Sequence, residues 1–156
     1  MIKVIFLDID GVLNSRKYDL TRDYAQNTNI DETRLPLLKE IVDVTGAKIV
    51  LSSTWRMHWN ENAKECNESG NYLNACFEKF GLKIYSKTPI LARNTPRKDE
   101  IEAWLRETDE EIESFVILDD YAFGWGNLAE RLVKTSAYVG FGLEKEHVEK
   151  AIALLK

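Results

Sequence analysis

Short apolar runs alternate with longer segments of mixed polarity along the chain, as in proteins whose strands alternate with helices. Residues 3–9 (KVIFLDI) and 47–53 (AKIVLSS) are β-branched and apolar, with the length expected of strands buried on both faces. A third run covers residues 115–118 (FVIL), and shorter candidate strands cover residues 82–85 and 132–135. We therefore expect these segments to form the strands of one sheet.

Apolar residues recur at helical spacing in the segments between these runs. Pro36 is tolerable only in a first turn and Gly46 is well placed to end a helix, so the two residues frame a helix over residues 31–45. Thr95 is a good N-cap, with Pro96 as the first helical residue. The expected helices are residues 31–45, residues 72–80 closed by Gly81, a helix from Pro96 that buries Ile101, Trp104 and Leu105, and residues 143–155.

Strands that alternate with helices predict a three-layer, Rossmann-like α/β fold with a parallel sheet and helices on both of its faces. The sequence shows no repeat, low-complexity tract or linker, so we expect residues 1–156 to form a single domain. In such sheets, functional residues gather just beyond the carboxyl ends of the strands. Candidate chemistry should therefore lie at those ends.

The first predicted strand ends in two carboxylates, Asp8 and Asp10, followed by Gly11. Side chains two residues apart can project to the same side, and the glycine allows a sharp turn. Two like charges so close repel each other, which implies a bound cation or a raised pKa. Taken alone, however, the same residues could form a solvated turn.

More polar groups follow at the other expected strand and helix ends. Hydroxyls and free backbone N–H groups at these places suit an anion such as phosphate. Each group alone has an ordinary explanation as a surface residue, but their order along the sheet favours one shared site. The groups are the hydroxyls of Ser52, Ser53 and Thr54, the bases Arg97 and Lys98, and the carboxylates of Asp119 and Asp120.

This order resembles the four motifs of phosphatases of the haloacid dehalogenase superfamily. The resemblance extends nearly end to end. The chain is similar to a small branch of this superfamily that has no cap domain, a phosphatase-like domain also found in multidomain RNA-repair proteins. Spacing to Ile101 favours Arg97 over Lys98 as the third motif. The four motifs here are residues 6–12 (FLDIDGV), residues 49–56 (IVLSSTWR) with Ser52 or Ser53, then Arg97 or Lys98, and residues 117–120 (ILDD).

The resemblance implies a Mg²⁺-dependent phosphohydrolase that acts on a phosphate monoester through an aspartyl-phosphate. Asp8 would be the nucleophile, and Asp10 would protonate the leaving oxygen and later activate water. The implied Mg²⁺ ligands are the side chains of Asp8 and Asp119 and the backbone carbonyl of Asp10. Asp120 would orient the water shell of the metal or the basic residue. The implied contacts to the phosphoryl oxygens are Ser52 or Ser53 and Arg97 or Lys98.

The gaps between the motifs bear on the substrate. Residues 14–30 show no regular element and residues 57–94 hold at most a helix and a strand, so neither gap accommodates the cap domain that usually covers small substrates in this superfamily. An open site suits a bulky partner such as a nucleic acid end or a phosphoprotein. The candidate rim residues, which could equally be ordinary surface and core residues, are Arg16, Lys17, Arg22, Arg56, Arg93, Tyr18, Trp55 and Trp59.

Composition narrows these possibilities only a little. The net charge of -5 argues against a protein whose whole surface coats nucleic acid, although it permits a local basic site. Cys66 and Cys76 are the only cysteines and fit two reduced thiols in a cytoplasmic protein. No signal peptide or membrane span is expected. The oligomeric state stays open.

Several other functions are compatible with parts of this pattern. A catalytically weak phosphate-binding protein of the same fold, a small-metabolite or nucleotide phosphatase, and an enzyme that transfers phosphate to an acceptor other than water all share these residues. A receiver domain is disfavoured, because its phosphorylated aspartate follows a later strand, whereas here residues 50–53 end in serines.

Overall fold

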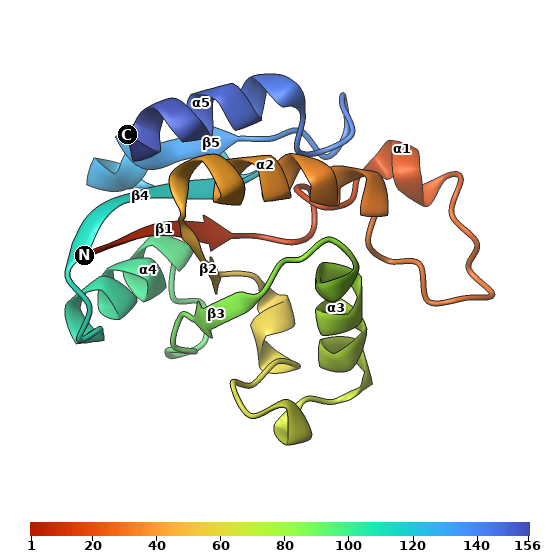
Figure 1. Ribbon diagram of the computed structural model, residues 1–156, viewed down its shortest axis with the longest axis horizontal. Helices are drawn as coiled ribbons and strands as arrows, with labels where there is room; N and C mark the ends of the chain where they lie inside the picture. Colours follow the sequence, from red (N-terminus) through yellow and green to blue (C-terminus); the bar gives the residue numbers. More distant parts are fainter.

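The computed structural model describes all residues 1–156, which form a five-stranded sheet. Helices lie on either side of the sheet (Figure 1). The strand order is β3-β2-β1-β4-β5, and every neighbouring pair is parallel. The strands are β1 (Ile2–Leu7), β2 (Lys48–Leu51), β3 (Ile84–Lys87), β4 (Ile112–Asp119) and β5 (Leu132–Lys134). The helices are α1 (Arg16–Asp19), α2 (Leu35–Thr45), α3 (Glu68–Lys79), α4 (Arg97–Glu107) and α5 (Lys145–Leu155), and the short 3₁₀ helices are η1 (Glu32–Arg34), η2 (Thr54–Met57), η3 (Ala63–Glu65) and η4 (Gly126–Arg131).

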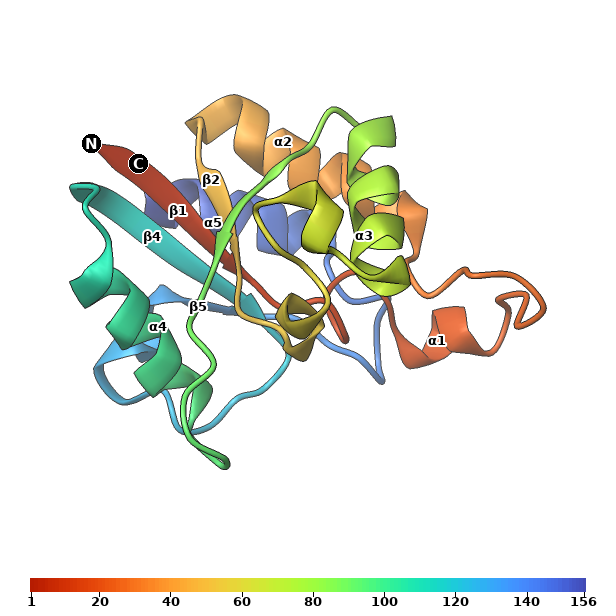
Figure 2. The same cartoon turned by 90° about the horizontal axis from the view of Figure 1, so that it is seen from below.

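Helices cover both faces of the sheet, which confirms the predicted three-layer architecture. Helices α2 and α5 pack together on one face and α4 lies on the other (Figures 1 and 2). The sheet separates two buried apolar clusters, and side chains alternate between them along each strand. On β1, Ile5 and Leu7 belong to the larger cluster under α2 and α5, whereas Val4 and Phe6 belong to the smaller cluster under α4.

The start of α4 differs from the prediction. Pro96 is not helical but extended, with ψ at 144°, and the helix begins at Arg97. The Thr95 hydroxyl donates to the Ala92 carbonyl oxygen in the preceding turn and so is not a cap. No side chain caps the helix, so the backbone N–H groups of its first turn keep some free hydrogen-bonding capacity.

Helix α1 was not expected, and helix α3 begins earlier than expected. Residues 14–30 contain the short helix α1, whose cap is Ser15. Helix α3 begins at Glu68, one residue after Asn67, whose side chain accepts from the first free N–H groups of the helix. By contrast α2 ends at Thr45 as predicted, with Gly46 in the left-handed conformation at φ 72°.

The connections between strands contain no inserted domain. The chain between β1 and α2 holds only α1 and η1, and the chain between β2 and β3 holds only η2, η3 and α3. The expected absence of a cap domain is therefore confirmed, and the carboxyl ends of the strands are left open. Cys66 and Cys76 are both free thiols. No helix has both the length and the apolar character needed to cross a membrane.

Candidate active site

Strand register brings the first, second and fourth motifs to the same face of the sheet. Phe6 pairs with Val50 on β2 and with Ile117 on β4, and all three side chains lie in the smaller cluster under α4. Because side chains alternate along a strand, the residues two positions further on point to that same face. Those residues are Asp8, Ser52 and Asp119.

Arg97 joins two of these side chains from the first residue of α4. Its Nη1 lies 3.1 Å from Oδ2 of Asp8 and 2.6 Å from Oδ2 of Asp119. The second oxygen of each carboxylate accepts a backbone N–H at 2.9 Å, from Ile9 for Asp8 and from Tyr121 for Asp119. Both carboxylates are buried, so these contacts fix their orientation.

Asp120 completes a cluster of three carboxylates. One oxygen from each of Asp8, Asp119 and Asp120 lies within 4.8 Å of the others, and only the single guanidinium of Arg97 offsets their charge. Burial raises the pKa of Asp8 to about 7, with repulsion from the other two carboxylates adding to the rise and Arg97 opposing it. Burial and Asp119 likewise raise the pKa of Asp120. This excess of oxygen donors fits a hard divalent cation.

Gly11 allows Asp120 to approach the first motif. The glycine has φ +87°, and a Cβ added to it would lie 2.4 Å from the Asp120 carboxylate. Only a residue without a side chain therefore fits between the β1 end and Asp120.

Asp10 lies outside this cluster. Its exposed carboxylate borders the cavity, where Oδ1 accepts from Asn14 Nδ2 at 2.9 Å and Oδ2 accepts from Trp55 Nε1 at 3.3 Å. The structure thus separates the two carboxylates of the first motif, one buried against Arg97 and the other open to a bound molecule.

The structure distinguishes Arg97 from Lys98 and Ser52 from Ser53. Successive helical residues point about 100° apart, and Lys98 accordingly pairs with Glu102 at 2.5 Å, away from the aspartates. Ser53 Oγ accepts from the Trp55 N–H and begins η2. Ser52 is fully buried on the aspartate face, and its Oγ has no hydrogen-bond partner. Neither serine borders the cavity, so their contact with phosphate stays a prediction.

A cavity of about 760 Å³ opens above these residues. Of the candidate rim residues, Arg16, Arg22 and Arg56 border it, whereas Trp59 is a core residue that donates to Asn74. The sequence did not point to several of the residues around the cavity. They include Asn14, Asp19, Asn29, Glu100, Tyr121, Trp125 and Tyr138. Asp19 and Glu100 lie in α1 and α4, and the others come from loops whose paths no local pattern specifies.

The sequence also gave no indication of a buried ion pair beside the cavity. Arg56 Nη2 lies 2.7 Å from Oε2 of Glu100, and both side chains are at least nine-tenths buried. The same Glu100 oxygen accepts the Leu91 N–H, and Arg56 donates to the Ser53 carbonyl oxygen. An arginine at the end of the second motif and an acid in the first turn of a helix are each common, and only the packing of α4 brings them together.

A Rossmann-like parallel sheet with this acidic edge, faced by an arginine at the start of α4, defines a protein of the haloacid dehalogenase (HAD) class. Residues 4–148 match the family described as the HAD domain in Swiss Army Knife RNA repair proteins. The chain belongs to this family of small HAD domains, and its function is of the phosphohydrolase type. HAD proteins generally use a divalent metal, in keeping with the three clustered carboxylates. Neither the curated proteins nor the solved structures include a match.

Proposed function

We propose that the protein is a Mg²⁺-dependent phosphatase that hydrolyses phosphate monoesters through an aspartyl-phosphate on Asp8. The observation that carries the proposal is the separation of the carboxylates into two environments. Asp8 and Asp119 are buried against Arg97 with Asp120 beside them, whereas the exposed Asp10 borders the cavity and accepts hydrogen bonds from Asn14 and Trp55. A nucleophile must be ionised, and Arg97 with a bound cation would keep Asp8 so. A proton donor must reach the leaving oxygen, and Asp10 borders the cavity.

The carboxylates of Asp8, Asp119 and Asp120 would hold the Mg²⁺, with the backbone carbonyl of Asp10 as a further ligand implied by the family. The metal would neutralise charge on the phosphoryl group and on the clustered carboxylates. Arg97 already lies between two of these carboxylates and would balance charge on the phosphoryl oxygens. Ser52 or Ser53 would donate a hydroxyl to the same oxygens.

The reaction would take two steps. An oxygen of Asp8 attacks phosphorus while the bond to the leaving oxygen breaks, and Asp10 gives that oxygen a proton. Asp10, now ionised, then takes a proton from water as the water oxygen attacks phosphorus, which breaks the bond to Asp8 and releases inorganic phosphate. Asp8 and Asp10 end the cycle in their starting states.

We propose a nucleic acid end as the substrate. The family description names RNA repair proteins, and the cavity is not covered by a cap. Of the 12 large hydrophobic residues that are exposed, only Met1 and Val44 lie away from the loops that follow the carboxyl ends of the strands. The other ten lie in those loops, Tyr121 and Tyr138 border the cavity, and the aromatic rings among the ten offer faces on which bases can stack. They are Leu20, Tyr24, Met57, Ile90, Leu91, Tyr121, Phe123, Tyr138, Val139 and Phe141.

Phosphate release from a panel of substrates tests both parts of the proposal. The panel holds p-nitrophenyl phosphate, nucleotides, phosphopeptides, and oligonucleotides with a 3′- or a 5′-phosphate. We expect release that needs Mg²⁺, stops with EDTA, is abolished by Asp8→Asn and is fastest on an oligonucleotide end. Preference for a phosphopeptide or a nucleotide would overturn the substrate assignment alone. No Asp8-dependent release from any member would overturn the phosphatase assignment.

A further inference from the structure

Each oxygen of the Asp10 carboxylate accepts one hydrogen bond, and the two donors come from different parts of the chain. Asn14 follows four residues after Asp10, whereas Trp55 belongs to η2 beyond the next strand. Both contacts are side chain to side chain, at 2.9 Å and 3.3 Å. An exposed carboxylate has no packing to fix its direction, so these two donors alone set it.

Both donors are anchored to one short stretch of backbone. Asn14 Nδ2 also donates to the Asn29 carbonyl oxygen at 3.1 Å. The Trp55 ring lies 6.5 Å from the ring of Tyr72, whose hydroxyl accepts the Ile30 N–H at 3.0 Å. A shift of residues 28–30 would therefore move both donors.

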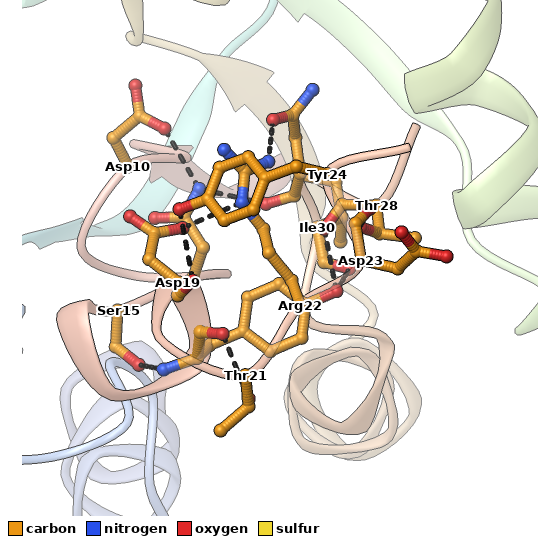
Figure 3. Close-up of polar contacts among 12 residues, drawn as sticks. Asp10, Ser15, Asp19, Thr21, Arg22, Asp23, Tyr24, Thr28 and Ile30 are labelled. Atoms are coloured by element: carbon orange, nitrogen blue, oxygen red, sulfur yellow. Dashed lines mark hydrogen bonds and ion pairs between the residues drawn. The ribbon is translucent and has the colours of Figure 1, made fainter. Parts of the chain in front are cut away.

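Residues 28–30 end the loop that contains α1, which we call the arch (residues 16–30), and side chains from earlier in the arch hold them. The Tyr18 hydroxyl donates to the Thr28 carbonyl oxygen at 2.6 Å and lies 3.1 Å from that of Ile30. Arg22 packs over the Tyr24 ring, 4.1 Å from its centre, and also donates to the Asn29 side chain. Figure 3 shows Asp10 at one side of this set of contacts and the side chain of Arg22 stacked on the ring of Tyr24.

We propose that Asn14 and Trp55 are positioning residues for Asp10, and that the arch sets their places. This inference rests on the role given to Asp10 in the proposed function. Each donor occupies one side of one carboxyl oxygen and leaves the other side free for the leaving oxygen or for water. The donors hold the carboxyl group in one plane, so the proton moves in a fixed direction. They exchange no proton themselves.

Trp55→Phe tests the proposal directly. The variant keeps an aromatic ring against Tyr72 but removes the N–H that Asp10 accepts. The readout is kcat/KM on two esters, the best alcohol phosphate of the panel and p-nitrophenyl phosphate. An alcohol leaves poorly without a proton and p-nitrophenolate leaves well, so only the first ester needs Asp10 as an acid. We expect kcat/KM to fall about 10-fold on the alcohol phosphate, the effect of one hydrogen bond to a carboxylate, and to stay unchanged on p-nitrophenyl phosphate.

Two further variants probe the other donor and the arch. Asn14→Ala removes the amide that donates to Asp10 without placing a new charge beside it, and should give the same selective loss. Tyr18→Phe, which does not contact Asp10, should give a smaller loss on the alcohol phosphate only. The matched control is Trp59→Phe, which removes an indole N–H bonded to Asn74, and should leave the ratio of the two values unchanged.

A double-mutant test completes the experiment. In an Asp10→Asn background, Trp55→Phe should cause no further selective loss, because the acid it positions is gone. Equal losses on both esters, or a selective loss that persists without Asp10, would show that Trp55 only supports the fold and would overturn the proposal. If the wild-type protein shows no Asp8-dependent release at all, the proposed function fails first, and the role of Asp10 fails with it.

Discussion

At the scale of single residues, two aspartates of one motif lie in opposite environments. Asp8 is buried and paired with Arg97, and burial raises its pKa to about 7. Asp10 is exposed and bonded to Asn14 and Trp55. The difference follows from strand alternation up to Asp8 and from the turn that begins at Ile9 and includes Asp10 and Gly11.

Replacing Asp10 should affect the two steps in different ways. For Asp10→Asn we expect kcat/KM on an alcohol phosphate to fall at least about 100-fold, the lower end of general-acid effects. On p-nitrophenyl phosphate kcat/KM should hold, because the first step then needs no acid, while kcat should fall because the second step needs a base. Steady-state kinetics on both esters measure this. Unchanged turnover of the alcohol phosphate would contradict the assignment.

Replacing Gly11 should cost more than backbone strain alone. Gly46→Ala is the matched control, since Gly46 also has a positive φ of +72° but has no atom within 4 Å of the added Cβ. Strain at such a position costs about 1–2 kcal/mol. Gly11→Ala adds the clash with Asp120, so it should lower the free energy of unfolding by more than the control does. Because the clash displaces the Asp120 carboxylate, the variant should also need a higher Mg²⁺ concentration for activity. Urea titration of both variants tests the order, and equal losses would contradict it.

At the scale of elements, the Arg56–Glu100 pair joins η2 to the first turn of α4. Glu100→Ala should lower the free energy of unfolding by about 3–5 kcal/mol, because it leaves a buried guanidinium without its partner. The control Glu102→Ala breaks the partly exposed pair with Lys98 and should cost less than about 1 kcal/mol. Chemical denaturation measures both. A similar cost for the two variants would show that the buried pair does not join the elements.

Helix α5 should carry a pH dependence at its start. The Glu144 N–H donates to Nδ1 of His147 at 2.9 Å, which requires an unprotonated nitrogen, and burial lowers the pKa of His147 below its ordinary value of 6.5. Folding thus favours the neutral ring, so its contribution to stability is complete above about pH 6.5 and is lost as the pH falls below that value. His147→Gln should remove this part of the pH dependence of Tm between pH 5.5 and 8. Parallel curves for the two proteins would contradict it.

At the scale of the whole molecule, the sequence was most informative where burial is complete. Strands buried on both faces appear as continuous apolar runs, and parallel topology brings their carboxyl ends to one edge, so the place of Asp8 and Asp119 followed from patterns alone. Loop conformations were not accessible in this way. The extended Pro96, the helix capped by Ser15, and the donors on Asp10 depend on contacts between segments far apart in the chain.

The central claim is that Asp8 becomes phosphorylated. Asp10→Asn mixed with p-nitrophenyl phosphate and Mg²⁺, then quenched in acid, tests it most directly, because the first step proceeds while the second is slowed. Mass spectrometry should find a phosphoryl group on the peptide that contains Asp8, together with a burst of p-nitrophenol. Turnover without any phosphoryl group on Asp8, or with one on another residue, would contradict the account.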